Sequence, residues 1–214
     1  MSFVYYNCLL FMLFFIIFLL FENNFKSPKK IKLLIFFGLF TLLLRYLSLI
    51  LLCLLKDIEV IYKFRAFVYL DYLSIVVLAI SLSYIYLRFN KLSFNKFYII
   101  SLILFIIYFL GIKYLDLGVS LSKNFGYIIN IKGEEIVNGV SLIILGIIFL
   151  SLLFFIDKPN ILKREVLFLI FTIIIMIIEI ALMVFKIKIF PYLLISEGIF
   201  LLNVYKGINN FKKT

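Results

Sequence analysis

Long uninterrupted runs of apolar residues are the feature that most limits what this chain can fold into. A helix needs about 20 apolar residues to cross a hydrocarbon layer of roughly 30 Å. Backbone groups in lipid must be hydrogen bonded within the protein, so each run is expected to be helical. The runs predict an all-α, polytopic integral membrane protein with about seven transmembrane helices in one bundle. The expected spans lie near 3–21, 33–55, 66–87, 97–113, 137–156, 166–186 and 189–205.

Composition supports this class and excludes others. The chain is 66% hydrophobic, whereas a soluble domain has roughly 45–50% apolar residues. This excess argues against a soluble globular domain, a disordered chain and a small disulfide scaffold. Residues 1–214 are therefore expected to form a single transmembrane helical domain with no soluble domain. Glycine and proline are scarce, at 9 and 3 residues, which argues against a transporter whose helices are broken around a midplane site but allows rocking of intact helices.

The distribution of basic residues predicts the orientation. The first run resembles a signal peptide only in position, because no basic residue precedes it and no small-x-small cleavage site follows it. Cytoplasmic loops carry the excess of Lys and Arg, so the N-terminus is expected outside and the C-terminus in the cytoplasm. With this orientation 13 of the 22 basic residues are cytoplasmic: Lys26, Lys29, Lys30, Lys32, Arg88, Lys91, Lys96, Lys158, Lys163, Arg164, Lys206, Lys212 and Lys213. Eight are external: Lys56, Lys63, Arg65, Lys113, Lys123, Lys132, Lys186 and Lys188.

Charge and residue bias also bear on location and partners. The net charge is +11, but the basic residues follow the loops and form no nucleic-acid patch, so no nucleic-acid partner is expected. Residues with AT-rich codons dominate, which indicates a bacterial source and a bacterial cytoplasmic membrane. Histidine is absent. This excludes a His-based catalytic triad, a His metal ligand and an imidazole pH switch.

Four ionisable residues fall well inside the expected spans: Arg45, Asp71, Glu179 and Glu197. Each costs about 2.5–3.5 kcal/mol on membrane-insertion scales, and such residues usually face the interior of a bundle. They are the candidate ligand- or ion-binding residues. Depth estimates allow all four to meet in one cluster. One cation does not balance three carboxylates, so at least one carboxylate is expected to be protonated or to bind a cation.

Helical spacing places small and polar residues on the same faces as these charges. The faces are Gly38, Thr41, Arg45 and Ser48; Asp71, Ser74, Leu78 and Ser81; and Thr172, Met176, Glu179, Met183 and Lys186. Two interpretations remain open. The charges form a proton or cation pathway or a polar ligand pocket, or they form an interhelical ion pair between Arg45 and one acid.

Other segments give narrower predictions. The loop over 114–136 is expected outside, with a short hairpin within it. Pro191 is expected in the first turn of the last helix. Cys8 and Cys53 both lie in the outer half of the membrane in this orientation, so a disulfide between them is geometrically possible. Two free thiols are the simpler expectation.

Function is less constrained than fold. We find no catalytic, cofactor or metal motif, so a non-enzymatic protein without cofactor is favoured. The first hypothesis is a sensor-like or accessory membrane subunit, with the lipid bilayer and a second membrane subunit as partners. The alternative is a small-solute transporter or a cation or proton pathway that uses the intramembrane acids. An enzyme acting on lipid or peptidoglycan precursors is the third possibility, and no residue set supports it.

Overall fold

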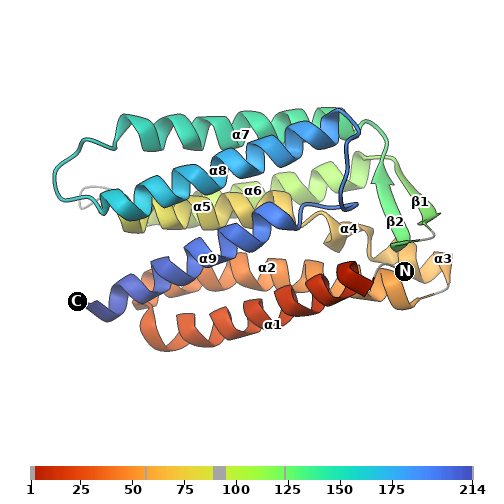
Figure 1. Cartoon of the computed structure of the whole chain (residues 1–214), viewed down its shortest axis with the longest axis horizontal. Coiled ribbons are helices and arrows are strands. Elements are labelled where there is room, and N and C mark those ends of the chain that lie inside the picture. Colours follow the sequence, from red (N-terminus) through yellow and green to blue (C-terminus); the bar gives the residue numbers. More distant parts are fainter. Residues whose placement is uncertain (1–2, 56, 89–94, 123, 214) are drawn as a thin grey trace.

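The computed structural model describes residues 3–55, 57–88, 95–122 and 124–213, and it is 78% helical (Figure 1). The helices are α1 (Phe3–Lys26), α2 (Lys29–Leu54), α3 (Ile58–Lys63), α4 (Arg65–Val68), α5 (Asp71–Leu87), α6 (Asn95–Tyr114), α7 (Glu134–Phe154), α8 (Lys163–Val184), α9 (Ile195–Asn209) and the 3₁₀ turn Asn210–Lys213. Two strands complete it, β1 (Leu117–Ser122) and β2 (Gly126–Ile131). Of the basic residues counted for orientation, Lys56, Lys91 and Lys123 lie outside the described residues, as do the side chains of Lys212 and Lys213.

Six helical segments are long and apolar enough to cross a membrane. They are α1, α2, the segment Arg65–Leu87 that contains α4 and α5, α6, α7 and α8. The structure therefore confirms a mostly helical chain with several membrane-spanning candidates. The last segment differs from the other six because α9 has only 15 residues, which gives about 22 Å at 1.5 Å per residue.

Two helix boundaries differ from the sequence-based expectation. The expected helical start near 189, with Pro191 in its first turn, is wrong, because 189–194 is irregular and α9 begins at Ile195. The residue before a proline disfavours the helical region, and proline itself has no N–H to donate. The span expected over 66–87 is present as Arg65–Leu87, but the chain turns within it between Val68 and Asp71.

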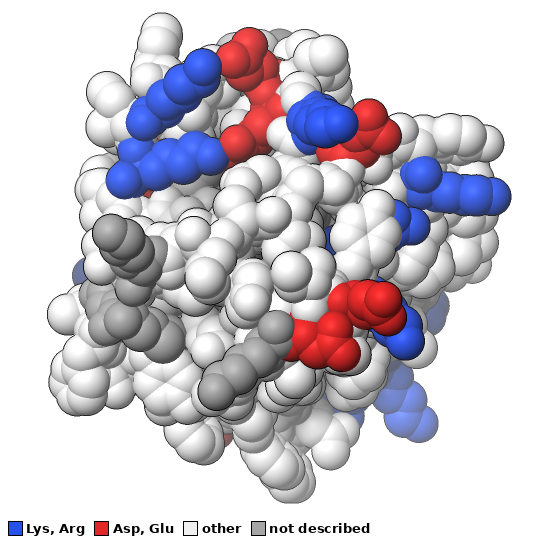
Figure 2. All heavy atoms as spheres, turned by 90° about the vertical axis from the view of Figure 1, so that its right-hand side faces the viewer, with Lys and Arg blue, Asp and Glu red and all other residues white. Residues whose placement is uncertain are grey.

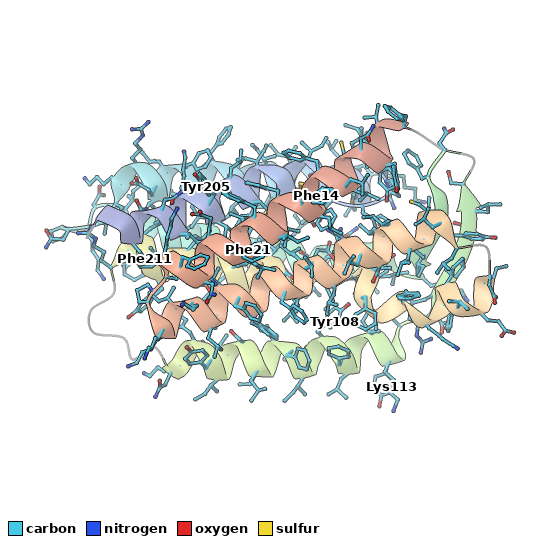
Figure 3. All side chains as sticks on the ribbon, turned by 90° about the horizontal axis from the view of Figure 1, so that it is seen from below. Phe14, Phe21, Tyr108, Lys113, Tyr205 and Phe211 are labelled. Carbon is cyan, nitrogen blue, oxygen red and sulfur yellow. The ribbon has the colours of Figure 1, made fainter. Side chains whose placement is uncertain are left out.

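The helices form a bundle in which α5 is buried along most of its length. Helix α2 packs against α1 and α5, and α8 packs against α7 and α9. Helix α6 lies at the edge of the bundle, with Lys113 pointing away from it (Figure 3). It buries only Ser101 and Ile112 among its residues. The outer faces of α1, α6 and α7 are mostly Phe, Ile and Leu, as expected for surfaces that face lipid.

The expected hairpin in the loop over 114–136 is present. Strands β1 and β2 pair antiparallel, from Leu117 opposite Ile131 to Ser122 opposite Gly126, and lie across one end of the bundle (Figure 1). The hydroxyl of Tyr69 donates to the Ile129 carbonyl, and the Ile129 N–H donates to the Tyr192 hydroxyl at 3.1 Å. These bonds fix β2 to the bundle.

Cys8 and Cys53 are free thiols in this structure. They come from different helices, α1 and α2. The Cys53 thiol lies 3.7 Å from the carbonyl oxygen of Phe125, in the turn of the hairpin. Cys53 is therefore a packing residue between α2 and the hairpin.

Gly38 tests how closely α2 and α5 must approach. A Cβ atom at Gly38 would lie 2.6 Å from Leu78 Cγ, whereas one at Gly146 on α7 has no heavy atom within 4 Å. Gly38→Ala is expected to destabilise the fold by about 1–3 kcal/mol because it overpacks the contact. Gly146→Ala is expected to be neutral or stabilising because alanine favours helix. Thermal unfolding of the purified variants in detergent measures both, and equal midpoints would contradict the close contact.

Candidate functional site: a buried charge cluster

Arg45 is the centre of a charge cluster that joins α2, α5 and α9. Its side chain is fully buried, and its Nη2 lies 3.3 Å from Asp71 Oδ2. Its Nη1 forms an ion pair with Glu197 Oε2, which also accepts a hydrogen bond from the Tyr46 hydroxyl. Asp71 and Glu197 are 3% and 1% exposed. We call Arg45, Asp71 and Glu197 the buried charge cluster.

The turn between α4 and α5 supplies a further ligand for the guanidinium. In a continuous helix the Val68 carbonyl would accept from the N–H of Tyr72. Here the Tyr72 N–H bonds to the Tyr69 carbonyl instead. The freed Val68 carbonyl accepts from Arg45 Nε at 3.0 Å. The guanidinium group therefore donates from Nε to this carbonyl and from Nη1 to Glu197, whereas Nη2 faces Asp71 without a hydrogen bond partner among the described residues.

Both acids of the cluster lie in the first turn of a helix. Asp71 is the first residue of α5, and Glu197 is the third residue of α9. The N-terminus of a helix carries roughly +0.5 elementary charge and stabilises a nearby carboxylate. Arg45 and the two helix ends each attract these carboxylates. The cluster therefore has less uncompensated negative charge than a count of its side chains suggests.

Two carboxylate oxygens of the cluster nevertheless have no hydrogen bond partner among the described residues. They are Asp71 Oδ1 and Glu197 Oε1, and both are buried. A buried acceptor without a partner costs about 1–3 kcal/mol. A proton or a small cation would relieve that cost, so these two oxygens are where the cluster could take part in chemistry.

Glu179 is separate from this cluster, so the expectation that all four charges could form one group is met by three of them. Its Oε2 accepts a hydrogen bond at 2.8 Å from the backbone N–H of Ser196, in the first turn of α9. A carboxylate at this position satisfies an N–H that has no partner within the helix. Glu179 is thus a cap for α9 supplied by a different helix.

A second polar network lies between α5, α8 and α9. Asn203 Nδ2 donates to Thr172 Oγ1 at 3.0 Å, and the Tyr86 hydroxyl donates to the Asn203 carbonyl at 2.9 Å. Between α5 and α2, Ser74 Oγ donates to Thr41 Oγ1 at 2.7 Å. Thr172, Thr41 and Ser74 lie on the faces predicted from helical spacing, and here they join helices, as expected for small polar residues in a membrane bundle.

The sequence did not identify Tyr46, Val68, Tyr86 or Asn203. Asn203 is a polar residue inside an expected span, and that alone could have marked it. Tyr46 gives no such signal, because tyrosine is common in this chain. Val68 acts through its carbonyl, which only the backbone conformation reveals.

The cavities do not lead to the buried charge cluster. Of the five cavities described here, none is lined by Arg45, Asp71 or Glu197. Within the described ranges no three Asp, Glu or Cys side chains are grouped so that they could hold a metal ion. The geometry is that of an enclosed ion pair network.

Comparisons with protein families, characterised proteins and solved structures give no match for this chain.

Neutralising Arg45 tests what the cluster contributes. Arg45→Gln leaves two buried carboxylates without their cation and is expected to cost about 3–5 kcal/mol. Asp71→Asn and Glu197→Gln each leave one ion pair intact, so each should cost less. The three substitutions combined remove every unpaired charge and should recover part of the loss. The order of stability of these variants is measured by their unfolding midpoints and by the yield of monodisperse protein in detergent.

Arg164→Gln is the control for the Arg45 substitution, because Arg164 is exposed at the start of α8. If Arg45→Gln were as stable as Arg164→Gln, the cluster would not hold the bundle together.

Proposed function

We propose that this chain is a multi-pass protein of a bacterial cytoplasmic membrane that acts as a non-enzymatic, sensor-like or accessory subunit. The observation that carries the proposal is the enclosure of the buried charge cluster. Arg45, Asp71 and Glu197 bind three helices together, and no described cavity reaches them. Charges used in this way stabilise an assembly rather than conduct a solute.

We further propose seven crossings, with the N-terminus outside and the C-terminus in the cytoplasm. The six long helices supply six crossings. The irregular segment 185–194 and α9 together supply the seventh, and the start of α1 and the end of α9 lie at opposite ends of the bundle (Figure 1). The expected outer end carries both signs of charge (Figure 2), including the Lys188–Glu134 ion pair at 2.7 Å. More basic residues belong to the other end, which supports the orientation.

Fusions test the orientation. Alkaline phosphatase fused within 114–136 is expected to be active, and the same enzyme fused after the last residue is expected to be inactive. Green fluorescent protein fused after the last residue should fluoresce, because it folds in the cytoplasm. Active phosphatase at the C-terminus would contradict the proposed orientation or the odd number of crossings.

One observation favours a second function, a proton or cation pathway. Asp71 Oδ1 and Glu197 Oε1 are buried without hydrogen bond partners among the described residues. Glu179 accepts a hydrogen bond from the N–H of Ser196, the residue before Glu197. Protonation of these acids in turn could carry a proton if water reached them.

Proteoliposomes distinguish the two functions. For an accessory subunit, proton and sodium fluxes into liposomes that contain the purified chain should equal those of empty liposomes. Glu197→Gln should lower the abundance of the chain in cell membranes, because it removes one ion pair to Arg45. Solubilised native membranes should contain the chain in a larger complex than the purified chain forms. A flux that Glu197→Gln abolishes, with an unchanged fold, would refute the accessory role and support the pathway.

A further inference from the structure

The largest described cavity is a groove on the surface of the bundle between α1 and α2. Its volume is about 670 Å³, within the range of roughly 300–1,000 Å³ for ligand pockets. The two helices lie side by side, facing the viewer in Figure 3. Most of the groove is apolar. Leu13, Ile17 and Leu20 line it from α1, and Phe36, Leu43 and Leu47 line it from α2.

One end of this groove is basic and polar. Lys29 and Lys32 line it there, at the start of α2, together with Asn23 and Asn24 from the end of α1. Asn23 is fully buried, and its Nδ2 donates to the Lys32 carbonyl at 2.9 Å. This bond fixes the two helices to each other at the basic end. Lys32 Nζ in turn contacts the Asn24 carbonyl, so its ammonium group is held beside the groove.

The polar end has an unused acceptor and a positive charge. Asn23 Oδ1 is buried and has no hydrogen bond partner among the described residues. Lys29 is exposed, and Lys29 and Lys32 both contribute to the groove wall. A ligand for this end would carry a negative charge for the lysines and a donor for the amide oxygen.

The groove is long enough to span one leaflet. Lys32 and Leu47 are 15 residues apart on α2, which corresponds to about 22 Å along the helix axis. One leaflet contributes half of a hydrocarbon core of about 30 Å, or roughly 15 Å. An acyl chain of a lipid in the leaflet next to Lys29 therefore fits along the groove, with its headgroup at the basic end.

We propose that the groove between α1 and α2 is a binding site for an anionic phospholipid of the phosphatidylglycerol type. Lys29 and Lys32 bind the phosphate, a glycerol hydroxyl of the headgroup donates to Asn23 Oδ1, and an acyl chain fills the apolar part. The site requires the chain to be in a membrane, as proposed above, but it does not depend on an accessory or a transport role.

Lipid binding to the full chain in detergent tests this site. Native mass spectrometry and thermal unfolding are measured with added phosphatidylglycerol, phosphatidylcholine or inorganic phosphate. Phosphatidylglycerol is expected to bind and to raise the unfolding midpoint more than the other two. Equal effects of phosphatidylglycerol and phosphatidylcholine would overturn the proposal, as would an equal effect of inorganic phosphate.

Substitution of the two lysines tests the headgroup end. Lys29→Gln combined with Lys32→Gln is expected to weaken phosphatidylglycerol binding about 10- to 30-fold, since each lysine near an anionic lipid surface contributes about a factor of five. The matched control is Lys163→Gln combined with Arg164→Gln, two exposed basic residues at the start of α8 that do not line the groove. Equal binding by the two double variants would overturn the proposal.

Filling the groove tests the acyl-chain end. Leu47 is 40% exposed and lines the groove, whereas Leu202 on α9 is 48% exposed and does not. Leu47→Trp is expected to reduce lipid binding at least several-fold with the lysines intact, and Leu202→Trp is expected to leave it unchanged. If the purified chain were instead a dimer that Leu47→Trp dissociates, a second copy would occupy the groove and the proposal would be wrong.

Discussion

A guanidinium group that is completely removed from water must be paired, because the effective cost of desolvating one ion is several kcal/mol. Arg45 meets this requirement through two carboxylates and one backbone carbonyl. Val68 and Asp71 flank the turn between α4 and α5, and Glu197 comes from α9. Each of these partners lies at the end or the start of a helix. The break after α4 frees the Val68 carbonyl, and the starts of α5 and α9 bring Asp71 and Glu197 to the same charge.

The short last helix follows from this requirement. If the helix began near 189, Glu197 would lie in its third turn rather than its first, without a helix end beside it. The irregular segment before α9 enters the bundle, where Tyr192, Leu193 and Leu194 are buried. Non-helical backbone at membrane depth is tolerated only where protein surrounds it. Glu179 supplies an acceptor for a backbone N–H in the first turn of α9, directly after the irregular segment.

The sequence predicts the helices and identifies the buried charged residues, but it does not predict which of these charges meet. Runs of apolar residues identify all the long helices because the hydrophobic requirement is local and strong. Helical spacing correctly places Thr41, Ser74 and Thr172 on contact faces. The break near Tyr69 could not be predicted, because Arg65–Leu87 contains neither glycine nor proline. That break is stabilised by a tertiary bond from Arg45 to Val68, and no local pattern encodes it.

The structure also changes the charge balance expected for the intramembrane residues. From the sequence alone, one arginine and three acids required a proton or a bound cation. In the structure Glu179 is separate from the group, and each of the two remaining acids lies in the first turn of a helix, where the partial positive charge of the helix N-terminus attracts a carboxylate. The negative charge that has to be balanced is therefore smaller than the sequence suggested. An enclosed cluster in which Arg45 faces both acids supports the proposed role in holding helices together.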